Sequence, residues 1–386
     1  MKIAIITSNF LPRIGGLEMF VHDLASQFIH KGHTVLVISQ RYPRHLKKRE
    51  TIGTVAVERI LFFNPPLVHK SAANIAAYIY TLLSAPLNCA RFFFRMKRFA
   101  PDVVNLHFAG SPSFFLLLFC ALNPVPLVVS LHGEDVRVLP HQSRIGRVIF
   151  KKLLCRADTI TVTSAHVLKQ VRDLEPSMHQ KMRVVQNGIN VHECVEAPSG
   201  GQAAQFILAA GRLVHKKGFD ILLEAFARLP QAFSDVQRIL VGEGPEEGDL
   251  RARIKQLRLE HRVVMWGRAS RSDVYSLMSG CRLFVVPSRD EPFGLVVLEA
   301  MACAKPIVAS KSGGPEEILT HEVNGLLVEK ESPEELAKAI GRLLEDAPLA
   351  ARLSDNAGRS VLDFDISRVA DAYLAIFGSV NKKVRA

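Results

Sequence analysis

Apolar and polar positions along this chain predict strands and helices in regular alternation. Short apolar runs of strand length recur, and amphipathic or apolar segments of helix length lie between them. In the first half, the expected strands are 2–8, 33–39, 54–61, 102–107, 126–131 and 158–163. The expected helices there are 16–30, 72–98, 112–122, 144–155 and 164–173. This order is typical of parallel α/β sheets.

A second series of strands begins at 205–210, after a segment with the composition of a linker. Its further strands are expected near 237–241, 262–266, 282–287, 306–309 and 325–328. The proposed linker, 188–204, is rich in turn and coil formers: Pro198, Ser199, Gly200 and Gly201. The chain has 386 residues, enough for two domains. We therefore predict two doubly wound α/β domains, 1–190 with a returning helix at about 365–386, and 191–364.

Net charge is distributed unevenly between the two halves. The chain carries +12 overall, and residues 1–195 hold 24 Lys and Arg against 11 Asp and Glu, a local balance of +13. Such asymmetry indicates an anionic partner for the first half: a membrane surface, a phosphorylated acceptor or nucleic acid. A basic surface that serves only solubility is the alternative.

The segment 71–90 has no charged residue, so a membrane span must be weighed against a crossover helix. Four of its residues are ones that a lipid-facing helix avoids: Asn74, Ser84, Pro86 and Asn88. Its large apolar residues also have amphipathic spacing, so a crossover helix is the better interpretation. Residues 91–99 mix phenylalanines with four cations, as in helices that lie on anionic bilayers. Phenylalanines in the core with cations in solvent are the alternative.

Cysteine usage and the N-terminus both favour a cytoplasmic protein. The six cysteines are scattered, with neither a Cys-x-x-Cys pair nor the spacing of a metal site, which favours a reduced interior. The apolar part of residues 1–8 is too short for a signal peptide. No metal is implied.

Glu291 precedes a predicted helix that follows a strand, and Glu299 lies about two turns inside that helix. Residues 281–288 predict a buried strand, and 294–303 have apolar residues on nearly every face, as in a helix packed on a sheet. The helix N-terminus offers unpaired N–H groups and a positive dipole end to an anion. A carboxylate at the end of a strand can accept hydrogen bonds from the hydroxyls of a ribose or a hexose.

Two cations follow the first strand of the second domain. Arg212 offers a bidentate fork for phosphate oxygens, and Lys217 places a compact charge at the start of a helix. A departing nucleoside diphosphate needs such cations because negative charge builds on its oxygen in the transition state. Lys216 is interpreted as a bystander, and an exposed basic turn is the alternative.

The first domain presents glycines and histidines after its predicted strands. Gly15 and Gly16 let the backbone approach a ligand closely and free amides for phosphate, although a tight turn also requires glycine. His132 follows a strand and is suited to orient a sugar hydroxyl or to assist proton movement. Asp135 is a candidate to fix its tautomer or to meet the acceptor, and His107 ends the neighbouring strand. A purely structural role for His132 remains open.

Other enzyme classes fit these residues less well. A glycoside hydrolase needs two carboxylates facing each other at about 5–9.5 Å, whereas eight residues along a helix span about 12 Å. The turn Gly242-Glu243-Gly244-Pro245 imitates a dinucleotide fingerprint, but its acids and proline would repel a pyrophosphate. Asp363-Phe364-Asp365 spells a metal-binding triplet without a preceding strand, so we discount it.

Together these motifs closely resemble the retaining glycosyltransferases of family 4, whose GT-B fold has two Rossmann-like domains facing across a cleft. The resemblance covers the whole chain and includes the paired glutamates, Arg212 with Lys217, and the Gly-Gly and His-Gly motifs. It implies that Glu291 and the amides of Phe293, Gly294 and Leu295 hold the donor sugar, while Glu299 grips the ribose. It also implies the remaining assignments: Arg212 and Lys217 bind the diphosphate, Gly15 and Gly16 contact donor phosphate or acceptor, and His132 lies beside the reacting carbons.

Departures from the family pattern are minor: Gln186 stands where proline is usual, and Arg268 follows the turn that would approach the nucleobase. Arg268 is therefore expected to alter how the base is held. In the family, the first domain lies on the acceptor side and the second binds the nucleotide sugar.

The resulting expectation is a metal-independent, retaining hexosyltransferase that uses a UDP- or GDP-linked sugar and needs no cofactor. Its acceptor would be a glycan or a lipid-linked molecule, as in bacterial cell-surface polysaccharide or lipopolysaccharide synthesis. We expect it to lie peripherally on the inner face of the cytoplasmic membrane, with no nucleic-acid partner. The alternatives are a glycosyltransferase for a small soluble acceptor, or a basic nucleic-acid- or membrane-binding protein without catalysis.

Overall fold

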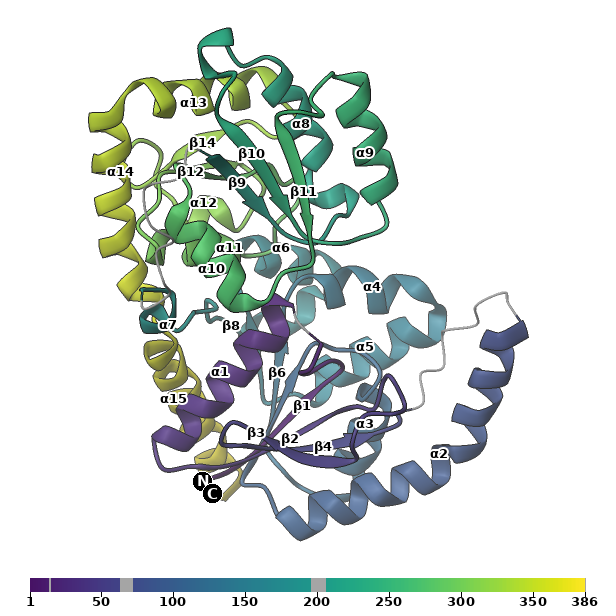
Figure 1. Cartoon of the computed structure of the whole chain (residues 1–386). Helices are drawn as coiled ribbons and strands as arrows, with labels where there is room; N and C mark the ends of the chain where they lie inside the picture. The colour runs from purple at the N-terminus through teal and green to yellow at the C-terminus, as the bar shows by residue number, and fades with distance from the viewer. Residues whose placement is uncertain (14, 63–71, 196–205, 386) are drawn as a thin grey trace. The chain divides into compact units, whose positions relative to one another are not determined.

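The computed structural model describes residues 1–13, 15–62, 72–195 and 206–385 (Figure 1). The chain divides into two compact units. The first comprises Met1–Asn187 together with the chain from Ile366 onward, and the second is Gly188–Asp365. Each unit is built around its own largely parallel sheet.

The sheet of the first unit has the order β3-β4-β2-β1-β5-β6-β7-β8. Its strands are β1 (Lys2–Thr7), β2 (Thr34–Gln40), β3 (Arg49–Ile52), β4 (Val55–Ile60), β5 (Val103–His107), β6 (Leu127–Leu131), β7 (Thr159–Val162) and β8 (Met182–Val184). Every neighbouring pair is parallel except β3 and β4. The carboxyl ends of the parallel strands therefore meet at one edge of the sheet, where ligands bind in open α/β sheets.

Helices cover both faces of this sheet. They are α1 (Gly16–His30), α2 (Ala72–Phe99), α3 (Ser113–Leu122), α4 (Glu134–Gln142), α5 (Arg144–Arg156), α6 (Ala165–Leu174), the short η1 (Pro176–Lys181) and α15 (Ile366–Arg385). Successive side chains of a strand point to opposite faces, so Ala4 and Ile6 of β1 join one buried cluster with Phe92 of α2, Phe115 of α3 and Phe150 of α5.

The final helix belongs to the first unit although the chain has passed through the second. In Figure 1, α15 lies beside α1, and the rings of Phe28 and Phe377 are 5.6 Å apart, centroid to centroid. The buried hydroxyl of Tyr373 lies 3.4 Å from Oγ1 of Thr161 on β7.

The second unit has a parallel sheet in the order β11-β10-β9-β12-β13-β14. The strands are β9 (Phe206–Ala210), β10 (Gln237–Val241), β11 (Val263–Gly267), β12 (Leu283–Val286), β13 (Ile307–Ser310) and β14 (Leu326–Val328). The helices are α7 (Val191–Val195), α8 (Phe219–Ala227), α9 (Glu247–Gln256), α10 (Arg271–Gly280), α11 (Leu295–Ala302), α12 (Pro315–Ile318), α13 (Pro333–Glu345) and α14 (Ala347–Ser360), with short 3-10 turns η2 (His215–Lys217), η3 (Gln231–Phe233) and η4 (Val361–Phe364).

The predicted strands all form, with ends displaced by one residue at most, but in the first unit the sequence pattern missed β3, β8, α4 and the short η1. Strands β3 and β8 are short and carry polar side chains, so their apolar signal is weak. Helix α4 has two acids in its first turn and Pro140 inside, which obscured its pattern.

The linker prediction was wrong in its first part. Ile189 bridges to Asp365, and Cys194 in α7 is fully buried, so 188–195 belongs to the folded second unit. A local composition of turn formers does not reveal such long-range packing. Residues 196–205, the rest of the predicted linker, lie outside the described residues.

Candidate functional site

In the second unit, the loops after the adjacent strands β9 and β12 carry most of the candidate residues. Arg212 and Lys217 follow β9, and Glu291 follows β12. The Nζ of Lys217 forms an ion pair with Oε2 of Glu291, which also accepts a hydrogen bond from Oγ of Ser288 at 3.4 Å. Arg212 is exposed, and no hydrogen bond or ion pair engages its guanidinium within the described residues. Two cations and a carboxylate therefore lie on neighbouring loops.

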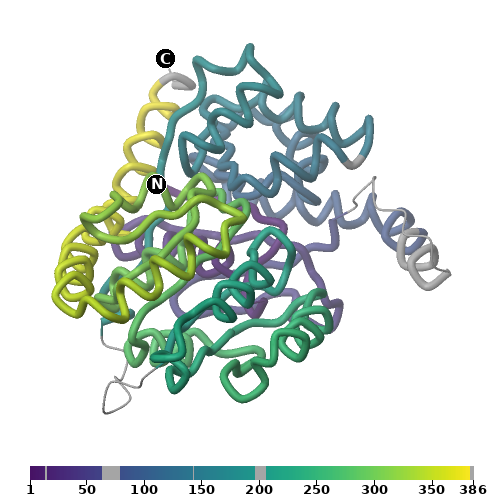
Figure 2. The backbone as a smooth tube through the Cα atoms, turned by 90° about the horizontal axis from the view of Figure 1, so that it is seen from above, coloured from purple at the N-terminus to yellow at the C-terminus, as the bar shows by residue number. Residues whose placement is uncertain are grey.

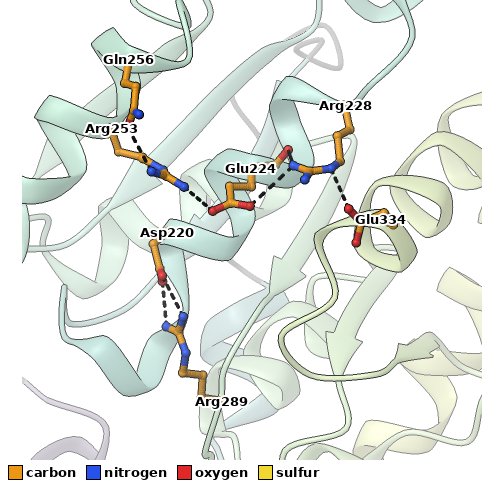
Figure 3. A network of polar contacts seen from close by, with 7 residues as sticks. All are labelled: Asp220, Glu224, Arg228, Arg253, Gln256, Arg289 and Glu334. Carbon is orange, nitrogen blue, oxygen red and sulfur yellow. Dashed lines mark hydrogen bonds and ion pairs between the residues drawn. The ribbon is translucent and has the colours of Figure 1, made fainter.

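Arg289 holds these two loops together (Figure 3). Its guanidinium makes paired 2.7 Å bonds to both carboxylate oxygens of Asp220, at the start of α8, and donates to the carbonyl of His215 at 2.9 Å. Its backbone N–H donates to the carbonyl of Lys216 at 2.8 Å. Burial alone would raise the pKa of Asp220, but the bonds from Arg289 outweigh it and lower that pKa. The loop with Lys217 is thus tied to the loop with Glu291.

Glycines allow this close approach of loops. Gly218 has φ +65° and lies so close to the Pro287 carbonyl that an added Cβ would clash. The turn with Gly244, which imitates a dinucleotide fingerprint, instead supports this loop, because the Leu213 N–H donates to the Glu243 carbonyl at 3.0 Å.

The predicted donor-sugar turn begins α11. Gly294 is its N-cap with φ +109°, a conformation that favours glycine, and Leu295 is the first helical residue. Phe293 is buried, so only its backbone is suited to a ligand. The backbone of Glu291 donates to the Ser312 carbonyl at 2.9 Å and accepts from Gly314 at 2.8 Å, which fixes the turn to the loop after β13.

Glu299 and Arg268 lie elsewhere in this unit. Burial raises the pKa of the Tyr275 hydroxyl and of the Cys194 thiol, and the charge of Glu299 raises both further, which places its half-buried carboxylate near α10 and α7. Arg268 follows β11, is largely exposed, and lies 3.7 Å from the carboxylate of Glu243. No described contact joins Arg268 to the Lys217–Glu291 pair.

In the first unit, an acidic side chain lies against the predicted phosphate loop. Gly15 is the N-cap of α1, and Gly16 begins the helix. The carboxylate of Glu18 lies against Gly15, where an added Cβ would clash with it. A carboxylate at a helix N-terminus occupies the position that favours an anion. Sequence reasoning missed Glu18, although its place in the first turn was a readable signal.

Three side chains at the edge of the same sheet form a hydrogen-bonded series. Asn105 Nδ2 donates to the Val128 carbonyl at 3.3 Å, so its Oδ1 is an acceptor and receives the Nε2–H of His107 at 2.6 Å. Nδ1 of His107 lies 3.1 Å from Nε2 of His132. Burial lowers the pKa of His107 well below its usual value, with His132 adding to the fall, and lowers the pKa of His132 to about 3.

These contacts assign the tautomers of both neutral rings. Because Nε2 of His107 carries its proton, Nδ1 is an acceptor, and His132 must donate through Nε2–H. Nδ1 of His132 then carries a lone pair and has no hydrogen-bond partner among the described residues. That nitrogen is buried, so it is an acceptor that the described residues leave unpaired.

The expectation that Asp135 fixes this tautomer or meets the acceptor is wrong. Asp135 is fully buried, and its carboxylate accepts backbone N–H bonds from His132, Ala109 and Val136 at 2.9–3.1 Å. Burial raises its pKa to about 6, and these bonds oppose the rise. His107 is also fully buried, so it acts behind His132 and does not face an acceptor.

Two further features of the described residues concern groups that could bind a metal ion and helices that could span a membrane. They hold no cluster of three or more His, Cys, Asp or Glu side chains arranged for a metal ion. Within the same residues, no helix has both the length and the apolar character needed to cross a bilayer. Asp363, part of the discounted metal triplet, lies in η4.

Comparison with known proteins matches both halves of the chain. The model of Glycosyltransferase Family 4 covers residues 14–193, and that of Glycosyl transferases group 1 covers 201–360. The uncharacterized glycosyltransferase MJ1178 of Methanocaldococcus jannaschii is 31% identical over 356 residues, 92% of each chain. N-acetyl-alpha-D-glucosaminyl L-malate synthase of Bacillus anthracis is 24% identical over 380 residues, 96% of this chain and 95% of that protein.

The fold is similar to that of a solved structure. Anabaena HepE in complex with UDP-glucose has a TM-score of 0.77 and 25% identity, covering 98% of this chain and 100% of that one. The two parallel-sheet α/β units are those of the GT-B fold. The chain therefore belongs to glycosyltransferase family 4, the group 1 glycosyltransferases, and it is a glycosyltransferase.

Proposed function

We propose that this protein moves a hexose-type sugar from a UDP- or GDP-linked donor to a hydroxyl of a glycan or lipid-linked acceptor. The observation that carries the proposal is the pairing of Lys217 with Glu291 on adjacent loops, with Arg212 exposed on the first of them. The two cations would stabilise the charge that builds on the departing diphosphate. The complex of Anabaena HepE with UDP-glucose supports a UDP-linked donor.

The proposed roles follow the family assignments. Glu291 and the backbone of Phe293, Gly294 and Leu295 hold the donor sugar, and Glu299 holds the ribose. The bond from the sugar's anomeric carbon to the phosphate oxygen breaks as the bond to the acceptor oxygen forms on the same face. The departing phosphate takes the acceptor's proton, so configuration is retained and neither a metal nor another cofactor is required.

The proposed acceptor belongs to cell-surface polysaccharide or lipopolysaccharide synthesis, at the inner face of the cytoplasmic membrane. The +13 balance of residues 1–195 supports an anionic surface as partner. An acceptor that is anchored in lipid would be reached from that surface.

Nucleotide-sugar binding tests the reaction. The full chain should bind UDP or GDP and the matching nucleotide sugar saturably by calorimetry, with EDTA causing no loss. Lys217→Ala should lower turnover by about 10²–10³-fold, because one contact to developing charge is lost. Lys216→Ala is the matched control and should change turnover little. Absence of nucleotide binding even at millimolar concentration would reject the proposal.

A small soluble acceptor is the second candidate. The name of the Bacillus anthracis relative, an N-acetylglucosaminyl L-malate synthase, favours it. Products from soluble hydroxy acids, without lipid, would support this candidate over the first. Family membership sets aside the alternative of a basic binding protein without catalysis.

A further inference from the structure

The outer sides of α2, α3 and α5 carry large apolar side chains that remain exposed. On α2, they recur at helical spacing and are exposed by 53%, 76%, 57% and 63%: Tyr80, Leu83, Leu87 and Phe94. On α3, the corresponding values are 43%, 41% and 70%: Phe114, Leu118 and Leu122. On α5, Ile145 and Val148 are 56% and 52% exposed. We call these nine residues the apolar face.

The described part of α2 before Ala85 contributes no side chain to the buried cluster of the first unit. From Ala85 onward the helix packs on the buried cluster through Cys89, Phe92 and Met96. In Figure 1, α2 lies at the outside of the first unit, and Figure 2 shows the described part of the same helix from above. Exposed apolar patches of this kind mark sites of interaction with a membrane or a protein.

Positive charge surrounds the apolar face. The helices α2, α3 and α5 contain no Asp or Glu. Their exposed cations without a described ion pair are Arg91, Lys97, Arg98, Arg144, Arg147 and Lys152. The guanidinium of Arg44 lies 4.3 Å from the ring centre of Tyr80, which places this cation beside the apolar face.

Three nearby acids form ion pairs with cations of α2 and α5. Glu58 pairs with Arg95 at 2.6 Å, and Asp158 pairs with Arg156 at 3.4 Å. A third acid, Glu175, lies 3.9 Å from Lys151. The face therefore presents apolar side chains within a positive rim.

We propose that the apolar face docks on an anionic lipid bilayer, with its side chains entering the boundary between headgroups and acyl chains. A second copy of this chain is disfavoured as the occupant, because an isologous contact would bring the same cations together. Anionic headgroups neutralise those cations while the bilayer takes up the apolar side chains. The inference deepens the proposed function, on which it rests for the lipid-linked acceptor.

Vesicle sedimentation of the full chain tests the proposal. Phosphatidylcholine vesicles with phosphatidylglycerol should bind the protein, and pure phosphatidylcholine should bind it weakly. Raising salt from about 0.05 M to about 0.5 M should weaken binding. Leu83→Glu with Leu87→Glu should reduce partition at least about tenfold, because two apolar side chains leave the bilayer. Arg91→Glu with Arg98→Glu should reduce it by at least about fivefold for each cation lost.

The matched control is Leu362→Glu, which alters a 54% exposed leucine in the second unit and should not change partition. Thermal unfolding and nucleotide binding of every variant should equal the parent, which separates failure of docking from failure of the donor reaction. Binding that ignores lipid charge, or survives Leu83→Glu with Leu87→Glu, overturns the proposal. So does a dimer in analytical ultracentrifugation that this double variant dissociates while no lipid binds.

Discussion

The proton position on His132 depends on two buried residues behind its ring. Asn105 is fully buried, its amide orientation is set by the Val128 carbonyl, and this orientation dictates the proton position on His107. His107 in turn dictates the proton position on His132. A neutral histidine has one donor and one acceptor nitrogen, so a series of such bonds transmits one choice of tautomer along its length.

Asn105→Leu should remove that choice. Without the Asn105 acceptor, the Nε2–H of His107 has no partner, so the proton moves to Nδ1, where His107 can donate to Nε2 of His132. His132 then carries its proton on Nδ1 in place of a lone pair, so turnover should fall by about 10²-fold. Nucleotide affinity, which the proposed function assigns to the second unit, should stay unchanged.

Nitrogen-15 spectra of histidine-labelled protein report the tautomer directly, with His132→Gln assigning the signal. The unsubstituted protein should show a protonated Nε2 and a bare Nδ1 on His132. A proton on Nδ1 in that protein would contradict the assignment.

At the scale of elements, ion pairs between segments far apart in sequence hold the loops with Lys217 and Glu291 in position. Arg289 joins α8, η2 and the loop after β12, whereas Arg228 joins Glu224 on α8 to Glu334 on α13 (Figure 3). Both arginines are partly exposed, but only Arg289 touches the loops with Lys217 and Glu291.

Arg289→Ala should therefore impair catalysis, and Arg228→Ala should not. Loss of the paired bonds to Asp220 frees the Lys217 loop, and a misplacement of about 1 Å is enough for a loss of about 10²-fold in kcat/KM. Steady-state kinetics with the nucleotide sugar measure both variants. Equal losses in the two would show that Arg289 serves only general stability.

The Asp220 pair also has a predicted pH dependence. The pKa of Asp220 is lowered in the folded state, so its contribution to stability is present above the ordinary carboxyl pKa of 3.8 and is lost as pH falls through the folded value. In Arg289→Ala this acid-side loss should shrink, as measured by urea unfolding at a series of pH values.

At the scale of the whole molecule, α15 makes the first unit discontinuous in sequence. Phe377 is fully buried against Phe28 of α1, and Tyr373 lies against β7 and the ring of His107, 5.7 Å between centroids. The chain must therefore return from the second unit before the first unit can complete its core.

Phe377→Ala should destabilise the first unit by about 3–5 kcal/mol, as is usual when a buried phenylalanine is truncated. The only tryptophan, Trp266, lies in the second unit and reports its unfolding by fluorescence. Circular dichroism reports both units. We expect the variant to shift the dichroism transition more than the fluorescence transition.

Leu353→Ala, in the fully buried core of α14, is the matched variant of the second unit and should shift the Trp266 transition. Identical shifts of both signals for both variants would show that the units unfold as one.

The sequence by itself determined the elements whose signal is local. Strand positions, both α/β units and the placement of Arg212, Lys217 and Glu291 after strands followed from apolar periodicity and from the rule that ligands bind at the carboxyl ends of parallel strands. The family motifs added the glycosyltransferase identity. These features could be predicted because each depends on residues that are close together in the chain.

Only the tertiary structure decided which polar groups meet. It placed Asp135 on backbone N–H groups, put His107 behind His132, used Arg289 to join two loops, and folded 188–195 into the second unit. It also left the apolar face on the outside, although the same leucines and phenylalanines fit a buried core equally well by composition. The physical reason is that burial and hydrogen bonding depend on contacts between distant segments, and a local pattern of side chains does not specify those contacts.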